Sequence, residues 1–248
     1  YKYMAKIMLG NMSEIGQVGL YESAEKIISV PITLITAMGT VMLPRVTNLL
    51  SNDNKEQAEK YLKQGIIFII SISLPMIFGI FAVSDTLAPL YFGQGFEETA
   101  ISVIFIGIAN VIRTQYLIPK EKDREYIISV FIGFVINLIV NVLLIPKYNA
   151  IGAAIATVCT ETAVCVIQII FFQEKRIFLE NKKAILYFII SSIIMYIVVN
   201  AVGYYIKDDL SSIIVKVVVG VMAYCVLNIK YILSMLGNQK KMKKTINT

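Results

Sequence analysis

A single carboxylate, Glu161, lies in the middle of an otherwise apolar stretch, AIATVCTETAVCVIQIIFF, which occupies residues 154–172. An ionised carboxylate in apolar surroundings is costly unless it is paired, hydrogen-bonded or used in transport. No basic residue lies three or four positions away along the chain. Two interpretations remain open. Glu161 is either protonated and hydrogen-bonded across a helix bundle, or it faces a water-filled cavity and binds an ion, a proton or a substrate group.

Polar side chains recur at helical spacing in several apolar stretches. Residues three or four positions apart share one helix face, and a polar face avoids lipid. We therefore expect these faces to line a shared hydrated interior. They comprise a first set, Glu22, Glu25, Ser29, Thr33, Thr36 and Thr40; a second, Thr157, Glu161, Cys165 and Gln168; a third, Gly133, Asn137 and Asn141; and a fourth, Asn110, Arg113 and Thr114.

The polar faces and the nearby cations also have purely structural interpretations. Asn137 and Asn141 are suited to hydrogen bonds between helices. Arg113 lies near the end of its span, where a long side chain extends to the membrane surface, and Lys216 is expected to do the same. Lys26 can pair with Glu22 one helical turn earlier.

The composition places all these residues in a membrane protein. Of the 248 residues, 57% are hydrophobic and only 16% are charged, and the mean hydropathy is +0.71. The apolar residues form blocks of about 20, the length of helix that crosses a bilayer. The blocks are continuously apolar rather than alternating, which favours helices over barrel strands.

Seven complete spans follow a truncated first one. Pro31 and Pro75 fall inside spans and are expected to kink them. The loop after Pro44, about 20 residues long, contains SNDNKEQAEKYLKQ, which we interpret as an amphipathic helix on the membrane surface. The predicted spans cover residues 15–43, 65–87, 99–118, 126–145, 151–172, 184–206 and 211–234.

Lysine and arginine alternate between the loops. Loops rich in cations remain on the cytoplasmic side of a membrane. The loop after Pro44, the segment PKEKDRE, the segment QEKRIFLENKK and the C-terminal tail each hold three or more, whereas the intervening loops hold only Lys147 and Lys207. This predicts a cytoplasmic C-terminus. The net charge of +6 then follows from topology and an anionic inner leaflet, so we expect no nucleic-acid partner.

The residue types argue against covalent chemistry. Histidine is absent, which removes the commonest general base and metal ligand. Cys159, Cys165 and Cys225 lie in apolar blocks without a CxxC spacing. We therefore expect a protein that is not an enzyme, with no catalytic residue, metal site or cofactor.

The order of several motifs resembles a known family. YMAKIMLGNMSEIGQVGLYESAEKI, VMLPRVTNL, LAPLYFGQGFEET and YLIPKEKDREYIISVFIGFVINLIVNVLLIPKYNAIGAAIATVCTE occur in this order over residues 3–161. Together they are similar to the second half of the polysaccharide flippases of the MOP exporter superfamily. The chain begins at Tyr1 within an apparent span end, so we interpret it as part of a longer protein.

The resemblance implies an all-α fold, a polytopic membrane helix bundle that forms the C-terminal lobe of a MATE/MOP-like transporter. Residues 1–175 would form this lobe, and residues 176–248 would add two transmembrane helices and a basic cytoplasmic tail. It also implies that undecaprenyl-diphosphate-linked oligosaccharides are flipped across a bacterial plasma membrane for cell-surface polysaccharide synthesis. Family members often carry an acidic residue where this chain has Ala5, so no role at that position carries over.

On this interpretation, a cavity between two lobes accepts the sugar and diphosphate while the polyprenyl tail stays in lipid. Lys2, Lys6, Lys26 and Arg113 would attract the diphosphate, and Glu25 or Glu161 would bind a coupling proton or sodium ion. The other candidate lining residues are Glu22, Asn110, Asn137, Asn141, Thr157 and Gln168.

Three other functions stay open at this point. A drug or metabolite antiporter of the same superfamily would share every topological feature described above. A membrane enzyme such as a polysaccharide polymerase would need a larger extramembrane loop with clustered acids and bases, whereas the acidic pair in the KDDL turn is more simply a solvated helix start. A passive subunit or scramblase is the third.

Overall fold

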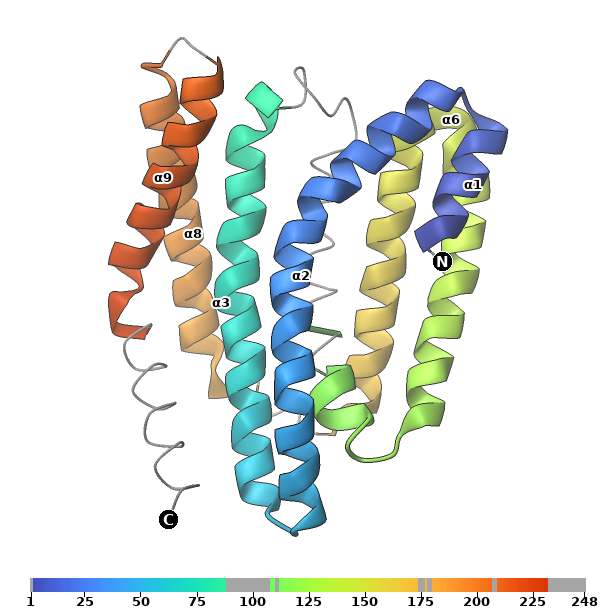
Figure 1. Cartoon of the computed structure of the whole chain (residues 1–248), viewed down its shortest axis with the longest axis vertical. Helices are drawn as coiled ribbons and strands as arrows, with labels where there is room; N and C mark the ends of the chain where they lie inside the picture. Colours follow the sequence, from blue (N-terminus) through green and yellow to red (C-terminus); the bar gives the residue numbers. More distant parts are fainter. Residues whose placement is uncertain are drawn as a thin grey trace.

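The computed structural model describes residues 2–87, 108–109, 112–173, 177, 180–206 and 209–231. Within these ranges the secondary structure is entirely helical, as the composition predicts. The helices lie roughly along one direction, as Figure 1 shows. They are α1 (Lys2–Met12), α2 (Ile15–Ser51), α3 (Lys55–Leu87), the short π-helix η2 (Arg113–Leu117), α6 (Asp123–Phe171), α8 (Lys182–Gly203) and α9 (Asp209–Leu227).

Helices α2 and α3 form a long hairpin that corrects one prediction. The expected loop of about 20 residues after Pro44, with its surface helix, is wrong: α2 continues to Ser51 and α3 begins at Lys55. The polar residues here are good helix formers, so helix continues beyond the apolar part. Val46 and Ala58 are buried against each other's helix, and this contact stabilises the hairpin tip.

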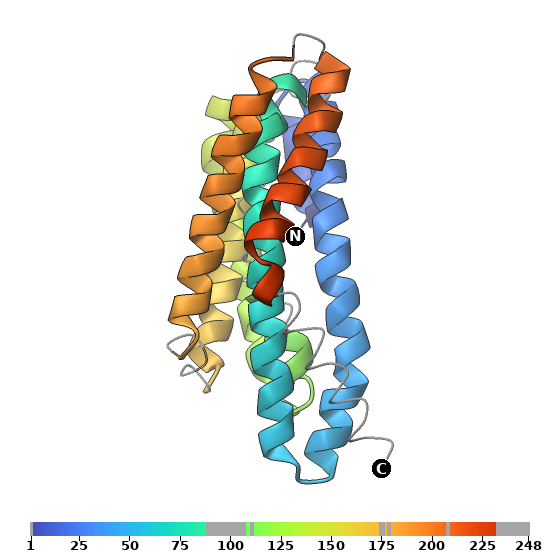
Figure 2. The ribbon, with the colours of Figure 1, turned by 90° about the vertical axis from the view of Figure 1, so that its left-hand side faces the viewer.

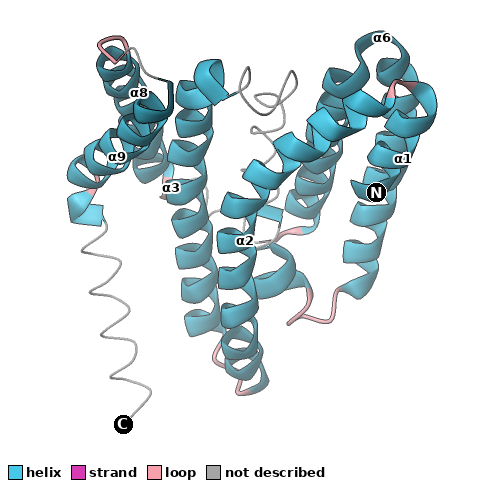
Figure 3. Ribbon diagram, turned by 45° about the horizontal axis from the view of Figure 1, so that its top comes forward, coloured by secondary structure: helices cyan, strands magenta, loops and turns pink. Residues whose placement is uncertain are grey.

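Helix α6 is a single 49-residue element with a break at Asn149, whose backbone angles are φ 48° and ψ −125°. At about 1.5 Å per residue it is far longer than a hydrocarbon core of about 30 Å. The break divides it into two arms that run side by side, as Figure 3 shows. These arms match the predicted spans 126–145 and 151–172.

Small residues allow the two arms of α6 to meet closely, as expected from the IGAAIA segment. Gly152, Ala153, Ala154 and Ala156 are all buried. A Cβ atom on Gly152 would lie 2.5 Å from the carbonyl oxygen of Leu144. The chain can therefore reverse direction here only because residue 152 has no side chain.

The helices pack as two groups that α2 connects. On one side α1 packs against α6, and on the other α8 and α9 pack against α3. Figure 2 shows α9 lying over α3 beside α8. Helix α2 contacts α1, α3 and α6, and Figure 1 shows that it bends as it passes between the groups. Pro31, predicted to kink this span, lies within it.

Several helices are long and apolar enough to cross a membrane. They are Ile28–Ser51 within α2, Lys55–Val83 within α3, Asp123–Phe171 and Lys182–Gly203, and the helical stretch Ser211–Leu227 is shorter but also apolar. The chain is thus a multi-pass membrane protein. Most of the predicted span 99–118 and the basic tail after residue 231 lie outside the described residues.

Lys216 also differs from its prediction. It was expected to extend to the membrane surface, but only 8% of the residue is exposed. Its aliphatic stem lies where a side chain on Gly203 would be. The glycine on α8 makes room for a lysine on α9, and the methylene groups of Lys216 pack within the α8 and α9 pair.

Candidate substrate and ion site

The polar row on α2 is largely exposed, although it lies in a stretch that is long and apolar enough to cross a membrane. Ser29, Thr33 and Thr40 are exposed and Thr36 is half-buried. Each hydroxyl donates a hydrogen bond to a carbonyl of its own helix: Ser29 to Lys26 at 2.6 Å, Thr33 to Ser29 at 2.7 Å, Thr36 to Thr33 at 3.1 Å and Thr40 to Ala37 at 2.8 Å. The row therefore faces away from the core of this bundle.

A charged cluster stands at the N-terminal end of this row, and Lys6 of α1 is its centre. The Lys6 Nζ atom lies 3.2 Å from Oε1 of Glu22 and 3.0 Å from Oε2 of Glu25. The three side chains are partly exposed, at 24%, 47% and 24%. The cluster thus joins α1 to α2 and carries two carboxylates for one ammonium group.

The predicted pair between Lys26 and Glu22 is wrong, because Lys6 takes Glu22 as its partner. Lys26 is exposed and forms no ion pair with any residue in the described ranges. Lys2 lies in the first turn of α1, and nothing further is described for its side chain. Lys6 and Lys26 are therefore the candidate cations that the structure places on or beside the polar face of α2.

Tyr21 connects this exposed cluster to the buried residues of α6, and no sequence pattern singles it out beyond its position beside Glu22. Its side chain is 2% exposed, and its hydroxyl lies 2.8 Å from Oγ1 of Thr157. Thr157 donates its own proton to the carbonyl of Ala153 at 3.0 Å. The phenol is therefore the donor in the bond between Tyr21 and Thr157.

Glu161 lies one helical turn from Thr157 and is 3% exposed. It interacts electrostatically with Tyr21 and Cys165, and Glu25, one turn along α2 from Tyr21, also interacts electrostatically with Tyr21. The predicted face of Thr157, Glu161, Cys165 and Gln168 is buried throughout. Of the two interpretations of Glu161, enclosure within the helix bundle fits the described residues better than an open cavity wall.

The asparagine pair also points inward. Asn141 donates to Oδ1 of Asn137 at 3.0 Å, and Asn137 donates to Oγ1 of Thr160 on the other arm at 3.0 Å. Nearer the other end, Gln168 donates to the hydroxyl of Ser129 at 3.2 Å. These bonds tie the two arms of α6 together, which is the structural role that interhelical amides commonly have.

Arg113 lies apart from the charged cluster. It begins η2, whose coil is near the opposite end of the bundle from α1 in Figure 1. Its guanidinium stacks over the ring of Tyr126 at 4.7 Å from the centroid. Asn110, predicted on the same face, lies outside the described residues. The predicted polar faces are therefore divided between an exposed row on α2, a buried network in α6 and a cation near the far end.

The bond between Tyr21 and Thr157 leads to a first prediction. Tyr21→Phe removes one buried donor and keeps the ring, so we expect the free energy of unfolding to fall by about 1 kcal/mol. Thermal unfolding of the purified chain in detergent measures this. Tyr205→Phe, at a position that is 84% exposed, is the matched control and should leave the unfolding temperature unchanged. Equal unfolding temperatures for both variants and the unmodified chain would contradict the contact.

The chain is similar to a known protein family over most of its length. The family described as "Lipid II flippase MurJ" matches residues 3–227. A protein named "Probable low-salt glycan biosynthesis flippase Agl15", from Haloferax volcanii, is 26% identical over 63% of this chain and 34% of its own length. A "Probable multidrug resistance protein NorM" from Bacillus cereus is 29% identical over 59% of this chain and 35% of its own length.

A solved structure has the same fold. The chain titled "Lipid II flippase MurJ, inward closed conformation" superposes with a TM-score of 0.77 over 95% of this chain and 51% of that one, at 14% identity. The present chain thus spans about a third of these two curated relatives and half of the solved structure.

Proposed function

The chain belongs to the lipid II flippase MurJ family, and from this premise we propose that it is one lobe of a lipid-linked oligosaccharide flippase. Its substrate would be an undecaprenyl-diphosphate-linked repeat unit, moved across the plasma membrane of a bacterium for cell-surface polysaccharide synthesis. The observation that carries the proposal is the exposed polar face of α2 with Lys6 and Lys26 beside it. Charged side chains on a membrane-spanning helix favour contact with water or protein over contact with lipid.

The chain's length relative to its relatives supports a second lobe facing this surface. We place residues 1–175 in the C-terminal lobe of such a protein and residues 176–248 in two further helices and a basic tail. The cation distribution supports a cytoplasmic C-terminus. The tip of the α2 and α3 hairpin would then face the cytoplasm, and the turn between α1 and α2 would face outward.

The mechanism that we propose is alternating access. The diphosphate would contact Lys6 and Lys26, with Lys2 nearby on α1 and Arg113 closer to the cytoplasmic entrance. The sugar would pass between the lobes while the polyprenyl chain remained in lipid. Glu25, in the exposed cluster, or Glu161, behind Tyr21, would bind a coupling proton or sodium ion. No catalytic residue and no cofactor are needed for this movement.

Removing the Lys26 charge tests the proposal. A charge-assisted contact contributes about 1.5–3 kcal/mol, so we expect Lys26→Gln to lower translocation of lipid-linked oligosaccharide at least roughly tenfold. The measurement uses the complete transporter in proteoliposomes. Lys147→Gln, at an exposed cation near the α6 break, is the control and should retain full activity. Unchanged translocation by Lys26→Gln would remove Lys26 from the substrate path.

An antiporter for drugs or metabolites is the alternative that the similarity to NorM supports. The two functions differ in the phenotype of a deletion strain. Loss of a flippase causes lipid-linked sugar to accumulate, whereas loss of an antiporter causes sensitivity to cationic dyes. A dye-sensitive strain with normal lipid-linked sugar would favour the antiporter.

A further inference from the structure

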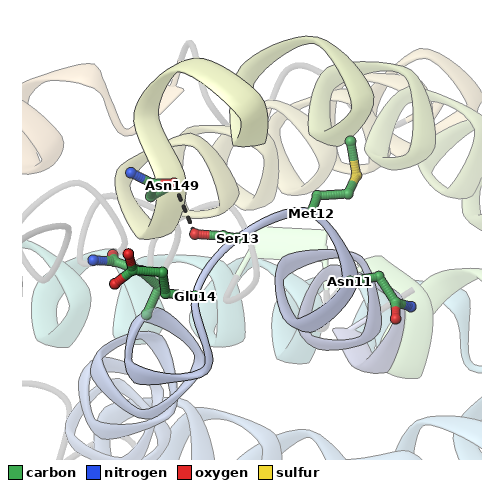
Figure 4. Close-up of a pocket in the computed structure, with 6 residues that line it drawn as sticks. Asn11, Met12, Ser13, Glu14 and Asn149 are labelled. Carbon is green, nitrogen blue, oxygen red and sulfur yellow. Dashed lines mark hydrogen bonds between the residues drawn. The ribbon is translucent and has the colours of Figure 1, made fainter.

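A polar hollow lies where the turn between α1 and α2 meets the break in α6. Its volume is about 400 Å³, within the range of small-molecule sites. Figure 4 shows the turn passing beside Asn149, with Glu14 and Asn149 extending to one side of it. The lining residues are Asn11, Met12, Ser13, Glu14, Gln17 and Asn149, so five of the six carry a polar side chain.

Two hydrogen bonds hold the hollow in shape and determine which groups remain for a ligand. The Ser13 hydroxyl donates to Oδ1 of Asn149 at 2.7 Å, and Oε1 of Gln17 accepts from the backbone N–H of Ala150 at 3.4 Å. Both amides are thus engaged through oxygen, which leaves their NH₂ groups as donors. Glu14 precedes α2, and its side chain forms no capping bond to that helix.

Asn149 adopts a backbone conformation that glycine adopts more readily. Its φ of 48° and ψ of −125° are costly for a residue with a Cβ atom. A glycine would make the same break in α6 at a lower cost, but it would not supply an amide. A glycine at position 149 would also remove the acceptor of the Ser13 hydrogen bond.

We propose that this hollow is a binding subsite for an uncharged sugar unit of the glycan. Sugar hydroxyls both donate and accept hydrogen bonds, and the hollow offers NH₂ donors from two amides and carboxylate acceptors from Glu14. Met12 supplies an apolar surface for the C–H face of a pyranose ring. The Glu14 carboxylate repels acidic sugars. This inference rests on the proposed function, which places the hollow at the outer end of the lobe, where the glycan emerges.

Saturation-transfer NMR on the full chain in lipid nanodiscs tests the subsite. The probes are maltose and N,N′-diacetylchitobiose, which are neutral, and digalacturonate, which is acidic. We expect the unmodified chain to bind both neutral sugars and to reject digalacturonate. Asn149→Gly removes the amide and suits the backbone, so it should weaken binding of the neutral sugars at least tenfold. Glu14→Gln should admit digalacturonate. Glu56→Gln, at an exposed carboxylate at the start of α3, is the control.

The subsite is refuted if the unmodified chain binds none of the three sugars or binds digalacturonate as well as the neutral ones. It is also refuted if Asn149→Gly and Glu14→Gln bind each sugar with the same affinity as the unmodified chain. Thermal unfolding checks that Asn149→Gly is folded, and an unfolding temperature at or above that of the unmodified chain is expected. Translocation of lipid-linked oligosaccharide by the complete transporter is measured separately. Sugar binding without translocation would refute the proposed function alone, and translocation without sugar binding would refute the subsite alone.

Discussion

Gly152→Ala is expected to destabilise the protein, whereas Gly79→Ala is expected to stabilise it slightly. A Cβ atom at position 152 would lie 2.5 Å from the backbone carbonyl oxygen of Leu144, but one at position 79 would have no atom within 4 Å. A backbone carbonyl cannot rotate away as a side chain can, so the two arms of α6 must separate. We expect the free energy of unfolding to fall by about 1–3 kcal/mol for Gly152→Ala.

The two variants form a matched pair because each adds one methyl group to a glycine in a membrane helix. Alanine is favoured over glycine in a helix by about 1 kcal/mol, and both variants gain from this preference. Only Gly152→Ala also introduces a clash, which opposes the gain. Thermal unfolding in detergent, followed by size-exclusion chromatography, measures both. Should Gly152→Ala raise the unfolding temperature as Gly79→Ala does, the arms would not approach each other as closely as described.

Reversing the charge of Lys6 is expected to have the largest effect on activity. The Lys6 ammonium group now lies within 3.2 Å of two carboxylates, those of Glu22 and Glu25. Lys6→Glu would replace it with a third carboxylate. Like charges brought together in this way cost several kcal/mol when they are shielded from water, and less at the partial exposure of this cluster. We expect translocation by the complete transporter to fall by more than about tenfold, together with a lower unfolding temperature.

The double variant Lys6→Glu with Glu25→Lys separates structure from substrate contact. It restores one ammonium group and two carboxylates, with the ammonium now on α2. If the cluster only joins α1 to α2, both the unfolding temperature and translocation should recover. If Lys6 also contacts the diphosphate, the unfolding temperature should recover while translocation stays low. Failure of both to recover would show that the cluster does not depend on this pairing of charges.

Much of the fold follows from hydropathy and from residues with special backbone properties. The two arms of α6 match their predicted spans, and the small residues after Asn149 lie where close approach was expected. The tip of the α2 and α3 hairpin could not be predicted in this way. Its polar residues suit a surface helix and a helix extension equally, and the apolar contact of Val46 with Ala58 across the turn decides between them.

The candidate site was predictable as helix faces but not as contacts. Periodicity placed Thr157 and Glu161 on one face, and Glu22 and Glu25 on another, but it did not tell which face would be buried. Spacing favoured Lys26 as the partner of Glu22, four residues away. The true partner, Lys6, lies 16 residues away on another helix, and only the packing of α1 on α2 brings it there.

The hydroxyl row on α2 has a consequence for the order in which parts of a substrate are held. Ser29, Thr33, Thr36 and Thr40 have each given their proton to a backbone carbonyl, so the row offers lone pairs and few protons to a passing molecule. A phosphate group only accepts hydrogen bonds, so it finds few donors along this row. A glycan hydroxyl can donate a hydrogen bond to the oxygen of each of the four side chains. On the proposed function, the diphosphate would therefore be held at the lysines, while the sugar hydroxyls donate hydrogen bonds to the serine and threonine hydroxyls of the row.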